Sequence, residues 1–319
     1  MPLSADMNLV TGATGFVGSS LIAALLQEPA WSVTAITRRP WSHQSPMVRS
    51  VAVGDLAEAC LPAGLLADTD AVVHAAAMTS LPPTAAAERV RAVNVGAAVA
   101  LARQAAKAGV RRFLFLSSIK VNGEETAPGR PFTAQDTPAP QDLYGRSKCE
   151  AERALQALAE ETGLELVIIR PSLIYGPGVG GNFAQMVRWV ARGVPLPFAS
   201  VNNKRTLLAL PNLLDLLKTA LASAEAAGRT LLAGDDEDFS TPQLLKGIGD
   251  ALGRPARLLP FPPSLLAATA SVLGKADVAR KVLGSLQLDI SQTRAQLHWS
   301  PPIPASQALR DTVRSLQLG

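Results

Sequence analysis

A tyrosine and a lysine four residues apart have the types and spacing best suited to chemistry in this chain. Tyr144 and Lys148 open a strongly helical run that extends to Glu161, and residues four apart share one face of a helix. A lysine ammonium beside a phenol stabilises the phenolate and lowers the pKa of the tyrosine, which can then donate or accept a proton. Because such pairs are common, their meaning depends on the surrounding elements.

A glycine-rich turn near the start of the chain is the second feature with a chemical use. An apolar run ends at Thr11, glycines follow at Gly12, Gly15 and Gly18, and an amphipathic run begins at Leu21. This pattern predicts a strand, a tight turn and a helix. Glycine there lets the backbone approach a pyrophosphate, whose charge is met by N–H groups at the helix N-terminus. Turns and close packing also recruit glycine, so the triplet alone gives only a hypothesis of dinucleotide binding.

Two arginines, Arg38 and Arg39, follow the second predicted strand, residues 31–36. An acidic residue about twenty positions after the glycine turn would hydrogen-bond the ribose hydroxyls and favour NAD, and this chain has none there. Guanidinium groups pair with phosphate in a bidentate manner. We therefore expect these arginines to bind the 2′-phosphate of NADP, so that NADP(H) is favoured and NAD(H) remains possible. The alternative is two solvated arginines at the surface.

Alternating strands and helices over the first half of the chain would hold these residues at one edge of a sheet. Apolar runs predict strands at residues 9–11, 31–36, 51–56, 70–77, 112–117 and 164–169, a helix over about 84–109 and a surface loop over 126–140. This alternation predicts an α/β fold, a doubly wound (Rossmann) parallel sheet. Ligands bind such sheets beyond the carboxyl ends of the strands.

Residues at these strand ends are candidate ligand contacts. Asp55 and Leu56 would flank the adenine, although Asp55 could instead cap the next helix. Three alanines at 75–77 would let a ligand lie against the backbone, or would allow tight helix–sheet packing. We expect His74 to be a satisfied buried histidine. Asn94 inside the predicted helix is mildly unfavourable there, which hints at a specific role.

Beyond residue 176 the alternation weakens, and proline-punctuated pieces suggest a smaller irregular lobe. We therefore expect a dinucleotide-binding domain with the catalytic residues at 1–175 and a smaller substrate-binding lobe at 176–319.

Composition excludes several classes of protein. The 319 residues carry a formal charge of +4, but no run of Lys and Arg with interleaved aromatics suggests a nucleic-acid groove. Cys60 and Cys149 form neither a disulfide framework nor a metal-ligand spacing, and the histidines are isolated, so we expect no metal. The apolar stretch at 265–273 falls short of the ~20 residues that a spanning helix needs. Without a recognisable leader, we expect a cytoplasmic protein in a reducing compartment.

Taken in chain order, these residues resemble the extended short-chain dehydrogenase/reductase family, which includes nucleotide-sugar epimerases, dehydratases and reductases. The resemblance covers essentially the whole chain. It includes Tyr-Gly-x-Ser-Lys at 144–148, Arg-Pro at 170–171, Tyr-Gly-Pro at 175–177 and a terminal Leu-His-Trp-x-Pro at 297–301. This combination is specific for the family, unlike any of its parts.

The resemblance implies a role for each matched position. Its catalytic residues correspond to Ser118 (with Ser117 as the neighbouring alternative), Tyr144, Lys148 and Asn94. Its cofactor contacts correspond to Gly12, Thr14, Gly15, Phe16, Val17, Gly18, Arg38, Arg39, Asp55, Leu56, Ala75, Ala76, Ala77, Tyr144, Lys148 and Pro171. Its substrate contacts correspond to Thr79, Ser118, Asn122, Tyr144, Asn182 and Arg205, of which the last two match more loosely.

A narrower likeness concerns the string Ser-Ile-Lys-Val-Asn-Gly-Glu at 118–124 with Asn-Lys-Arg at 203–205. It is similar to bacterial reductases of UDP-4-keto-6-deoxy-N-acetylhexosamines in O-antigen (lipopolysaccharide) sugar pathways. The resemblance implies NADPH-dependent reduction of the C4 ketone of such a nucleotide sugar. Tyr144 would donate the proton, Lys148 would lower its pKa and bind the cofactor ribose, and Ser118 would hydrogen-bond the carbonyl oxygen.

Other functions use the same residues. An NAD-dependent UDP-sugar 4-epimerase needs the same triad, but many family members carry Val-Tyr-Gly where this chain has Val-Asn-Gly at 121–123. A 4,6-dehydratase would want carboxylates beside the catalytic serine, where this chain has Ile119 and Lys120. A non-catalytic cofactor-binding scaffold would typically lack the tyrosine or the lysine.

Two predicted helices around 97–108 and 147–162 are rich in alanine, which permits close helix–helix approach. In the family, the corresponding helices often pair two subunits, so we expect a homodimer.

Overall fold

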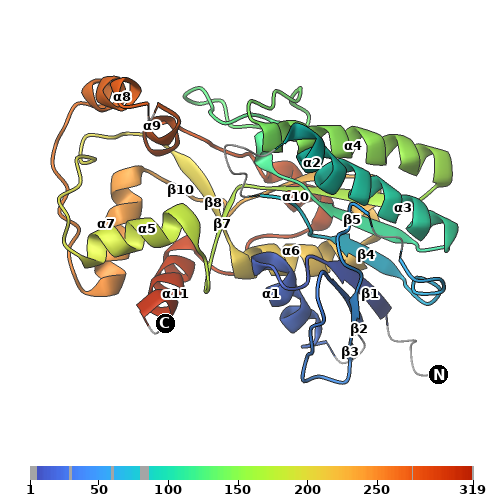
Figure 1. Cartoon of the computed structure of the whole chain (residues 1–319). Helices are drawn as coiled ribbons and strands as arrows, with labels where there is room; N and C mark the ends of the chain where they lie inside the picture. Colours follow the sequence, from blue (N-terminus) through green and yellow to red (C-terminus); the bar gives the residue numbers. More distant parts are fainter. Residues whose placement is uncertain (1–5, 29–30, 59–60, 80–85, 275, 318–319) are drawn as a thin grey trace.

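A seven-stranded parallel sheet forms the centre of the larger lobe (Figure 1). The computed structural model describes residues 6–28, 31–58, 61–79, 86–274 and 276–317. The strands are β1 (Asp6–Thr11), β2 (Trp31–Thr37), β3 (Val48–Ala52), β4 (Ala71–His74), β5 (Arg112–Leu116), β6 (Glu165–Pro171) and β9 (Thr230–Ala233). Their order across the sheet is β3-β2-β1-β4-β5-β6-β9. The predicted doubly wound α/β fold is confirmed.

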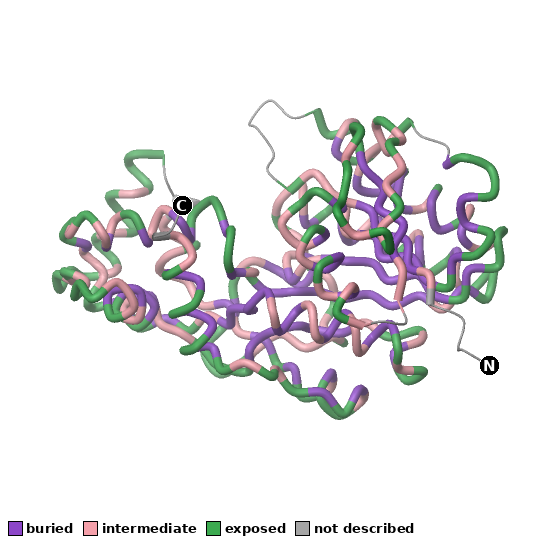
Figure 2. Tube along the Cα trace, turned by 90° about the horizontal axis from the view of Figure 1, so that it is seen from below, coloured by how far each residue is buried: buried purple, intermediate pink, exposed green. Residues whose placement is uncertain are grey.

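Helices cover both faces of this sheet. On one face lie α1 (Phe16–Leu25) and α6 (Leu210–Ala222), and on the other lie α2 (Ala87–Arg91), α3 (Ala97–Lys107) and α4 (Leu143–Thr162). Side chains alternate between the faces along a strand. Val73 therefore packs in the core under α1 and α6, whereas its neighbour Val72 packs in the core under α3 and α4. Figure 2 shows the buried residues concentrated along the strands.

The helix predicted over 84–109 is built from three consecutive pieces. A π-helical turn, η1 (Ala92–Gly96), joins α2 to α3, and Asn94 lies inside it. The start of the predicted helix, residues 84 and 85, lies outside the described residues. Single π-turns inserted in α-helices are frequent at functional sites.

The smaller lobe is built on a second sheet of three strands in the order β10-β8-β7. These strands are β7 (Leu173–Tyr175), β8 (Arg205–Ala209) and β10 (Asp238–Phe239). Beside them α5 (Gly181–Ala191), α7 (Thr241–Leu252) and α11 (Ala305–Gln317) enclose a core of their own. At the outer end of this lobe lie α8 (Pro263–Val272) and α9 (Ala276–Leu283), while α10 (Ser291–Leu297) packs against β9.

Two sequence-based boundaries need correction. The chain returns from the smaller lobe to the large sheet, because α6 packs against α1 and β9 pairs with β6. The simple division at residue 176 therefore does not hold. The third strand ends at Ala52 rather than at residue 56, which leaves Asp55 and Leu56 in the loop that follows. Nowhere in the described ranges is a helix both long and apolar enough to cross a membrane.

Candidate active site

The glycine turn between β1 and α1 forms a cradle that only glycine can build. Gly12 has a φ of +69°, and a Cβ there would lie 2.8 Å from the backbone nitrogen of Ala76. A Cβ at Gly18 would lie 2.2 Å from the carbonyl oxygen of Gly12, while the Gly15 N–H donates to that same oxygen at 2.9 Å. The backbone therefore turns tightly at the carboxyl edge of the sheet, and the cradle fits a dinucleotide pyrophosphate at the N-terminus of α1.

The loop after β4 forms the other wall of this cradle. The Ala76 N–H donates to the Thr11 hydroxyl at 3.3 Å, which ties the three half-buried alanines at 75–77 to the end of β1. Thr79 is exposed in the same loop. At the start of α1, Phe16 packs against the core of the smaller lobe, so the cradle adjoins both lobes.

Thr14 and Val17 complete the predicted contacts of the glycine turn. Thr14 is exposed in the turn itself, whereas Val17 is half-buried and packs against the core under α1. Pro171 is buried at the end of β6.

The predicted adenine contacts are partly occupied by protein groups. Asp55 accepts the Ala57 N–H at 3.0 Å and forms an ion pair with Arg89 of α2, as in the capping alternative. Leu56 is half-buried against the core. At the end of β2, Arg38 and Arg39 are both exposed.

Helix α4 begins at Leu143, one residue before the candidate tyrosine, and is fixed at that end. Asp142 caps it by accepting the Gly145 N–H at 2.6 Å. Lys120 forms ion pairs with Asp142 and, at 3.0 Å, with Glu124. Lys120 belongs to η2 (Ile119–Val121), the short helix after β5, so the start of α4 is bound to the segment that carries Ser118.

Lys148 is buried, and it lies one turn after Tyr144 along α4. Its ammonium donates to the Leu116 carbonyl at 2.8 Å and lies 4.4 Å from the centre of the Phe115 ring. Burial lowers the pKa of Lys148 to about 7, and Glu152 opposes this shift. A lysine with this pKa can gain or lose a proton near neutral pH.

The pKa of Tyr144 differs from the sequence-based expectation. Burial, followed by the nearby Asp142 carboxylate, raises the pKa of Tyr144, whereas a lowering by Lys148 was expected. The reason is that desolvation disfavours both the phenolate and the ammonium. Compared with exposed side chains, both groups are shifted toward their neutral forms.

The two serines after β5 have different partners. Ser117 is buried, and its hydroxyl donates to Glu152 of α4. Ser118 is half-buried, and its hydroxyl accepts the Lys120 N–H at 3.3 Å. Ser118 is therefore the more exposed of the two serines, and its assignment as the catalytic serine stays a prediction.

Asn94 connects the loop after β4 to the backbone of α4. Its carbonyl accepts the Met78 N–H at 2.7 Å, and its amide donates to the Ser147 hydroxyl at 3.0 Å. Ser147 in turn donates to the carbonyl of Tyr144 at 2.7 Å. The π-turn places Asn94 where it holds both segments.

A buried network beneath the site includes Glu152, which the sequence analysis missed, and Arg170, which it named only as part of the Arg-Pro at 170–171. Arg170, at the end of β6, forms a bidentate ion pair with Glu152, with a shortest distance of 2.5 Å. Arg170 also donates to the side-chain carbonyl of Asn122 at 2.9 Å, and the Asn122 amide donates to the Thr133 carbonyl at 2.8 Å. The sequence offered two signals for this pair. Glu152 is four residues after Lys148 on the same helix, and Arg170 directly follows an apolar strand run.

Asn122 was predicted to contact the substrate, but its side chain is bonded to other groups of the protein. It is buried, and both ends of its amide are bonded to protein groups. Contact with a substrate would require it to give up these bonds. The Asn in Val-Asn-Gly is thus explained by the network with Arg170.

His74 is buried as predicted, but only one of its ring nitrogens has a hydrogen-bond partner among the described residues. Its Nδ1 lies 3.0 Å from the Thr11 hydroxyl, but its buried Nε2 has no hydrogen-bond partner among the described residues. Burial, followed by the charge of Lys148, lowers the pKa of His74 to about 3, so the ring is neutral at physiological pH.

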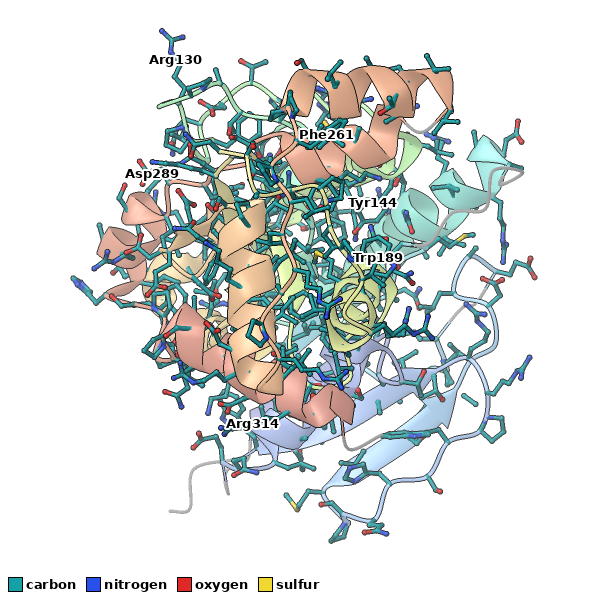
Figure 3. The ribbon with its side chains drawn as sticks, turned by 90° about the vertical axis from the view of Figure 1, so that its left-hand side faces the viewer. Arg130, Tyr144, Trp189, Phe261, Asp289 and Arg314 are labelled. Atoms are coloured by element: carbon teal, nitrogen blue, oxygen red, sulfur yellow. The ribbon has the colours of Figure 1, made fainter. Side chains whose placement is uncertain are left out.

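The candidate substrate residues of the smaller lobe are less closely grouped. Asn182 is exposed in the first turn of α5. Arg205 is half-buried at the start of β8, where it donates to the Gly284 carbonyl at 3.0 Å, and burial lowers its pKa. Figure 3 looks onto this lobe, with Tyr144 and Trp189 labelled near the middle of the view.

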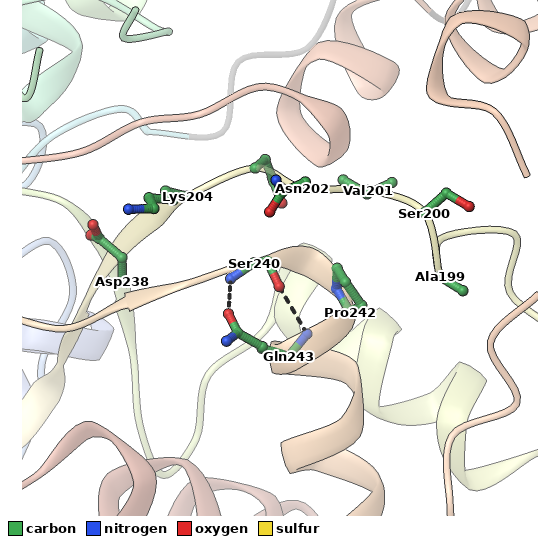
Figure 4. A pocket seen from close by; sticks show the side chains of 10 residues that line it. Ala199, Ser200, Val201, Asn202, Lys204, Asp238, Ser240, Pro242 and Gln243 are labelled. Atoms are coloured by element: carbon green, nitrogen blue, oxygen red, sulfur yellow. Dashed lines mark hydrogen bonds between the residues drawn. The ribbon is translucent and has the colours of Figure 1, made fainter. Parts of the chain in front are cut away.

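A polar cavity of about 520 Å³ lies elsewhere in the smaller lobe (Figure 4). It is lined by residues 199–204 and by the first turn of α7, where Ser240 and Gln243 cap the helix. None of the predicted catalytic, cofactor or substrate contacts lines it, although Asn203 and Lys204 of the Asn-Lys-Arg string do. Across the described ranges, no group of His, Cys, Asp or Glu side chains could hold a metal ion. Cys149 is buried, and Cys60 lies outside the described residues.

Comparisons with known proteins agree with this geometry. The NAD dependent epimerase/dehydratase family matches residues 8–234. A relative from Vibrio cholerae named UDP-glucose 4-epimerase is 40% identical over 96% of this chain and 94% of its own length. A relative from Escherichia coli O157:H7, named N-acetyl-alpha-D-glucosaminyl-diphospho-ditrans,octacis-undecaprenol 4-epimerase, is 26% identical over 82% of this chain and 77% of its own.

A solved structure has the same fold. The UDP-glucuronic acid 4-epimerase of Bacillus cereus in complex with NAD superposes with a TM-score of 0.80 over 98% of this chain and 99% of that chain, at 19% identity. At that identity the likeness concerns the fold alone. From the match over 8–234, the 40% identical relative and the glycine cradle with its tyrosine and lysine, it follows that the chain belongs to the NAD dependent epimerase/dehydratase family.

Proposed function

We propose that the protein is an NAD-dependent 4-epimerase of a sugar carried on a nucleoside diphosphate, with UDP-hexoses as the first substrates to test. The observation that carries this proposal is the buried Lys148 one turn after Tyr144 on α4, with its ammonium at the end of β5. The start of α4 is bound to the segment that carries Ser118, and the glycine turn at the carboxyl edge of the same sheet fits a dinucleotide. The 40% identical relative named UDP-glucose 4-epimerase supports this choice of reaction and substrate.

The chain's own residues have distinct tasks in this reaction. NAD, held at Gly12, Gly15 and Gly18, supplies reversible hydride transfer at C4 when it is bound. Tyr144 accepts the proton of the C4 hydroxyl and later returns it. Lys148 adjusts the charge beside the phenol, because its pKa of about 7 lets it be protonated when the phenolate forms. Ser118 hydrogen-bonds the same sugar oxygen.

A second candidate function is the NADPH-dependent reduction of a UDP-4-keto sugar. The exposed Arg38 and Arg39 at the end of β2, where no carboxylate is present, favour this candidate because they suit the 2′-phosphate of NADP. The Val-Asn-Gly at 121–123 gives less support to the reductase, because the side-chain amide of Asn122 is bonded to Arg170 and to the Thr133 carbonyl.

The test begins with the bound nucleotide and then measures turnover. Freshly purified protein is denatured, the released nucleotide is identified, and stripped protein is titrated with NADH and NADPH. We expect NAD to survive purification and UDP-glucose and UDP-galactose to interconvert. Consumption of NADPH with a 4-keto sugar nucleotide, from a site that prefers NADPH, would instead establish the reductase.

Tyr144→Phe should lower turnover by about 10²–10⁴-fold, the usual contribution of a positioned proton donor or acceptor. Binding of the nucleotide should be nearly unchanged, because the cradle lies on β1 and α1. Turnover and NADH binding are measured on the same preparation. Wild-type turnover in this variant would remove Tyr144 from the mechanism.

A further inference from the structure

The segment from residue 259 to residue 274 exposes apolar side chains to an unusual degree. These sixteen positions contain no charged residue. Of the large hydrophobic side chains exposed in the described parts of the chain, five of eight lie here, namely Leu259, Phe261, Leu265, Val272 and Leu273. Val272 is 87% exposed and Leu273 is 70% exposed. Such a concentration marks a surface that another phase or molecule covers.

Helix α8, which forms most of this segment, has no buried residue. It packs chiefly against α9, at the outer end of the smaller lobe and far from β3 (Figure 1). Figure 3 labels Phe261 close to these helices. Of the five exposed side chains, Leu265 and Val272 lie on α8, and the other three lie in the stretches directly before and after this helix.

Basic residues border this surface. Arg257 precedes the uncharged segment and is exposed, and Lys281 is exposed on α9. In the sequence, residues 275–281 carry three basic side chains and one acidic side chain. Leucine, valine and phenylalanine bordered by cations suit the interface of a bilayer that contains anionic lipids.

The α8–α9 pair is also joined to the candidate active site. Arg280 of α9 donates to the side-chain carbonyl of Gln141 at 3.2 Å and lies 3.6 Å from the carboxylate of Glu124. Gln141 is three residues before Tyr144. A partner that binds at α8 would therefore lie near the start of α4, because α9 contacts both α8 and the residues just before Tyr144.

We propose that residues 259–274 dock the protein on an anionic lipid bilayer, with α8 lying in the interface. At 1.5 Å per residue, the ten residues of α8 span about 15 Å, half of the ~30 Å hydrocarbon core, so the helix lies on the membrane and does not cross it. This docking goes beyond the proposed function and does not depend on which nucleotide sugar the site converts.

A second copy of the chain fits this surface less well. One face of a ten-residue helix presents on the order of 150 Å² in projection, whereas stable interfaces bury about 800 Å² on each partner. Two copies that met at α8 would also bring their Arg257 and Lys281 side chains close together, and these like charges would repel each other. Anionic head groups neutralise these cations instead.

The test is sedimentation of the full-length protein with vesicles of phosphatidylcholine alone and of phosphatidylcholine with phosphatidylglycerol. We expect binding to the anionic vesicles that weakens with added salt. Leu265→Asp combined with Val272→Asp should weaken this binding by about tenfold or more, because both apolar contacts are replaced by charge. The matched control is Met47→Asp, which changes an exposed apolar residue in the larger lobe and should bind as wild type.

Three outcomes would overturn the proposal. The wild type could fail to bind either vesicle, the double variant could bind as tightly as wild type, or the double substitution could lower the mass in light scattering, which would assign the surface to a second copy. Vesicle binding needs neither sugar nor nucleotide, and the double variant should convert UDP-hexoses at the wild-type rate. Loss of docking and failure of the proposed reaction are therefore separate results.

Discussion

The burial of Lys148 in the candidate active site lowers the stability of the folded protein at neutral pH. Its ammonium is buried against Phe115 and has the Leu116 carbonyl as its hydrogen-bond acceptor. The unfolded chain keeps this lysine protonated up to about pH 10.5, whereas burial lowers its pKa in the folded protein to about 7. Between these values the unfolded state binds the extra proton, so stability rises as the pH rises.

Lys148→Met should consequently stabilise the protein while it abolishes turnover. Each pKa unit corresponds to ~1.4 kcal/mol, and the unpaired Leu116 carbonyl returns about 1–3 kcal/mol of this, so the net gain at pH 7 should be on the order of 2 kcal/mol. The gain should fall as the pH rises, reach zero near about pH 9 and become a loss by pH 10.5, because the cost of the unpaired carbonyl does not change with pH. Thermal unfolding of wild type and variant across this range provides the measurement. A variant less stable than wild type at pH 7 would contradict the argument.

At the scale of elements, close backbone contacts decide the geometry of the site. The β1–α1 turn brings Gly12 against Ala76, and the π-turn brings Asn94 against Met78 and Ser147. These contacts bind β1, β4 and α4 together at the carboxyl edge of the sheet. Substitutions that need space there should damage binding as well as stability.

Gly12→Ala should remove nucleotide binding and destabilise the protein by more than its backbone strain alone. Alanine at this position would be strained by the positive φ, and its Cβ would lie 2.8 Å from the backbone nitrogen of Ala76. Gly109→Ala is the matched control, because Gly109 has a φ of +79° but open space around it, so it should cost only about 1–2 kcal/mol. Urea unfolding and NADH titration of both variants separate strain from collision. Equal effects of the two substitutions would show that the contact with Ala76 is unimportant.

The buried pair Arg170–Glu152 should behave as one unit. Arg170→Met leaves a buried carboxylate without its partner, which typically costs about 3–5 kcal/mol. Adding Glu152→Leu should recover part of this loss, because the unpaired charge is then removed as well. A double-mutant cycle of the free energies of unfolding measures the coupling. Strictly additive losses would mean that the two side chains act independently.

At the scale of the whole molecule, the two lobes are interleaved along the chain. Helix α6 and strand β9 return from the smaller lobe to the large sheet, and Phe16 of α1 packs against the core of the smaller lobe. The predicted substrate contacts Asn182 and Arg205 lie in the smaller lobe, so this interleaving would fix them relative to Tyr144. It also leaves the outer face of α3 and α4 open for association, as the alanine-rich sequences predict.

The protein should be a homodimer through α3 and α4, with twice the mass of one chain in light scattering at micromolar concentration. Ala157→Arg, on the exposed face of α4, should give the monomeric mass because two guanidinium groups would meet at the interface. A control, Leu265→Asp on α8, should leave the dimer intact. A monomeric wild type would remove the dimer from consideration.

The sequence by itself determined the fold class, the glycine turn and the candidate catalytic residues. Strand and helix periodicity depend on local burial, and the glycine spacing depends on local backbone geometry, so both can be recognised in a linear chain. Tyr144 and Lys148 share a helix face for the same local reason. The likeness to a family then supplied the roles of Ser118 and Asn94.

Only the tertiary structure decided the partners of the buried polar groups and the direction of the pKa shifts. Asn122 was expected at the substrate, but Arg170 engages it from a strand 48 residues further along the chain. The pKa of Tyr144 was expected to be lowered by Lys148, but desolvation, which depends on everything packed around both groups, raises the pKa of Tyr144 and lowers that of Lys148. The return of β9 to the large sheet depends likewise on strand pairing between distant segments. Burial and long-range pairing are properties of the assembled chain, and no local pattern of residues specifies them.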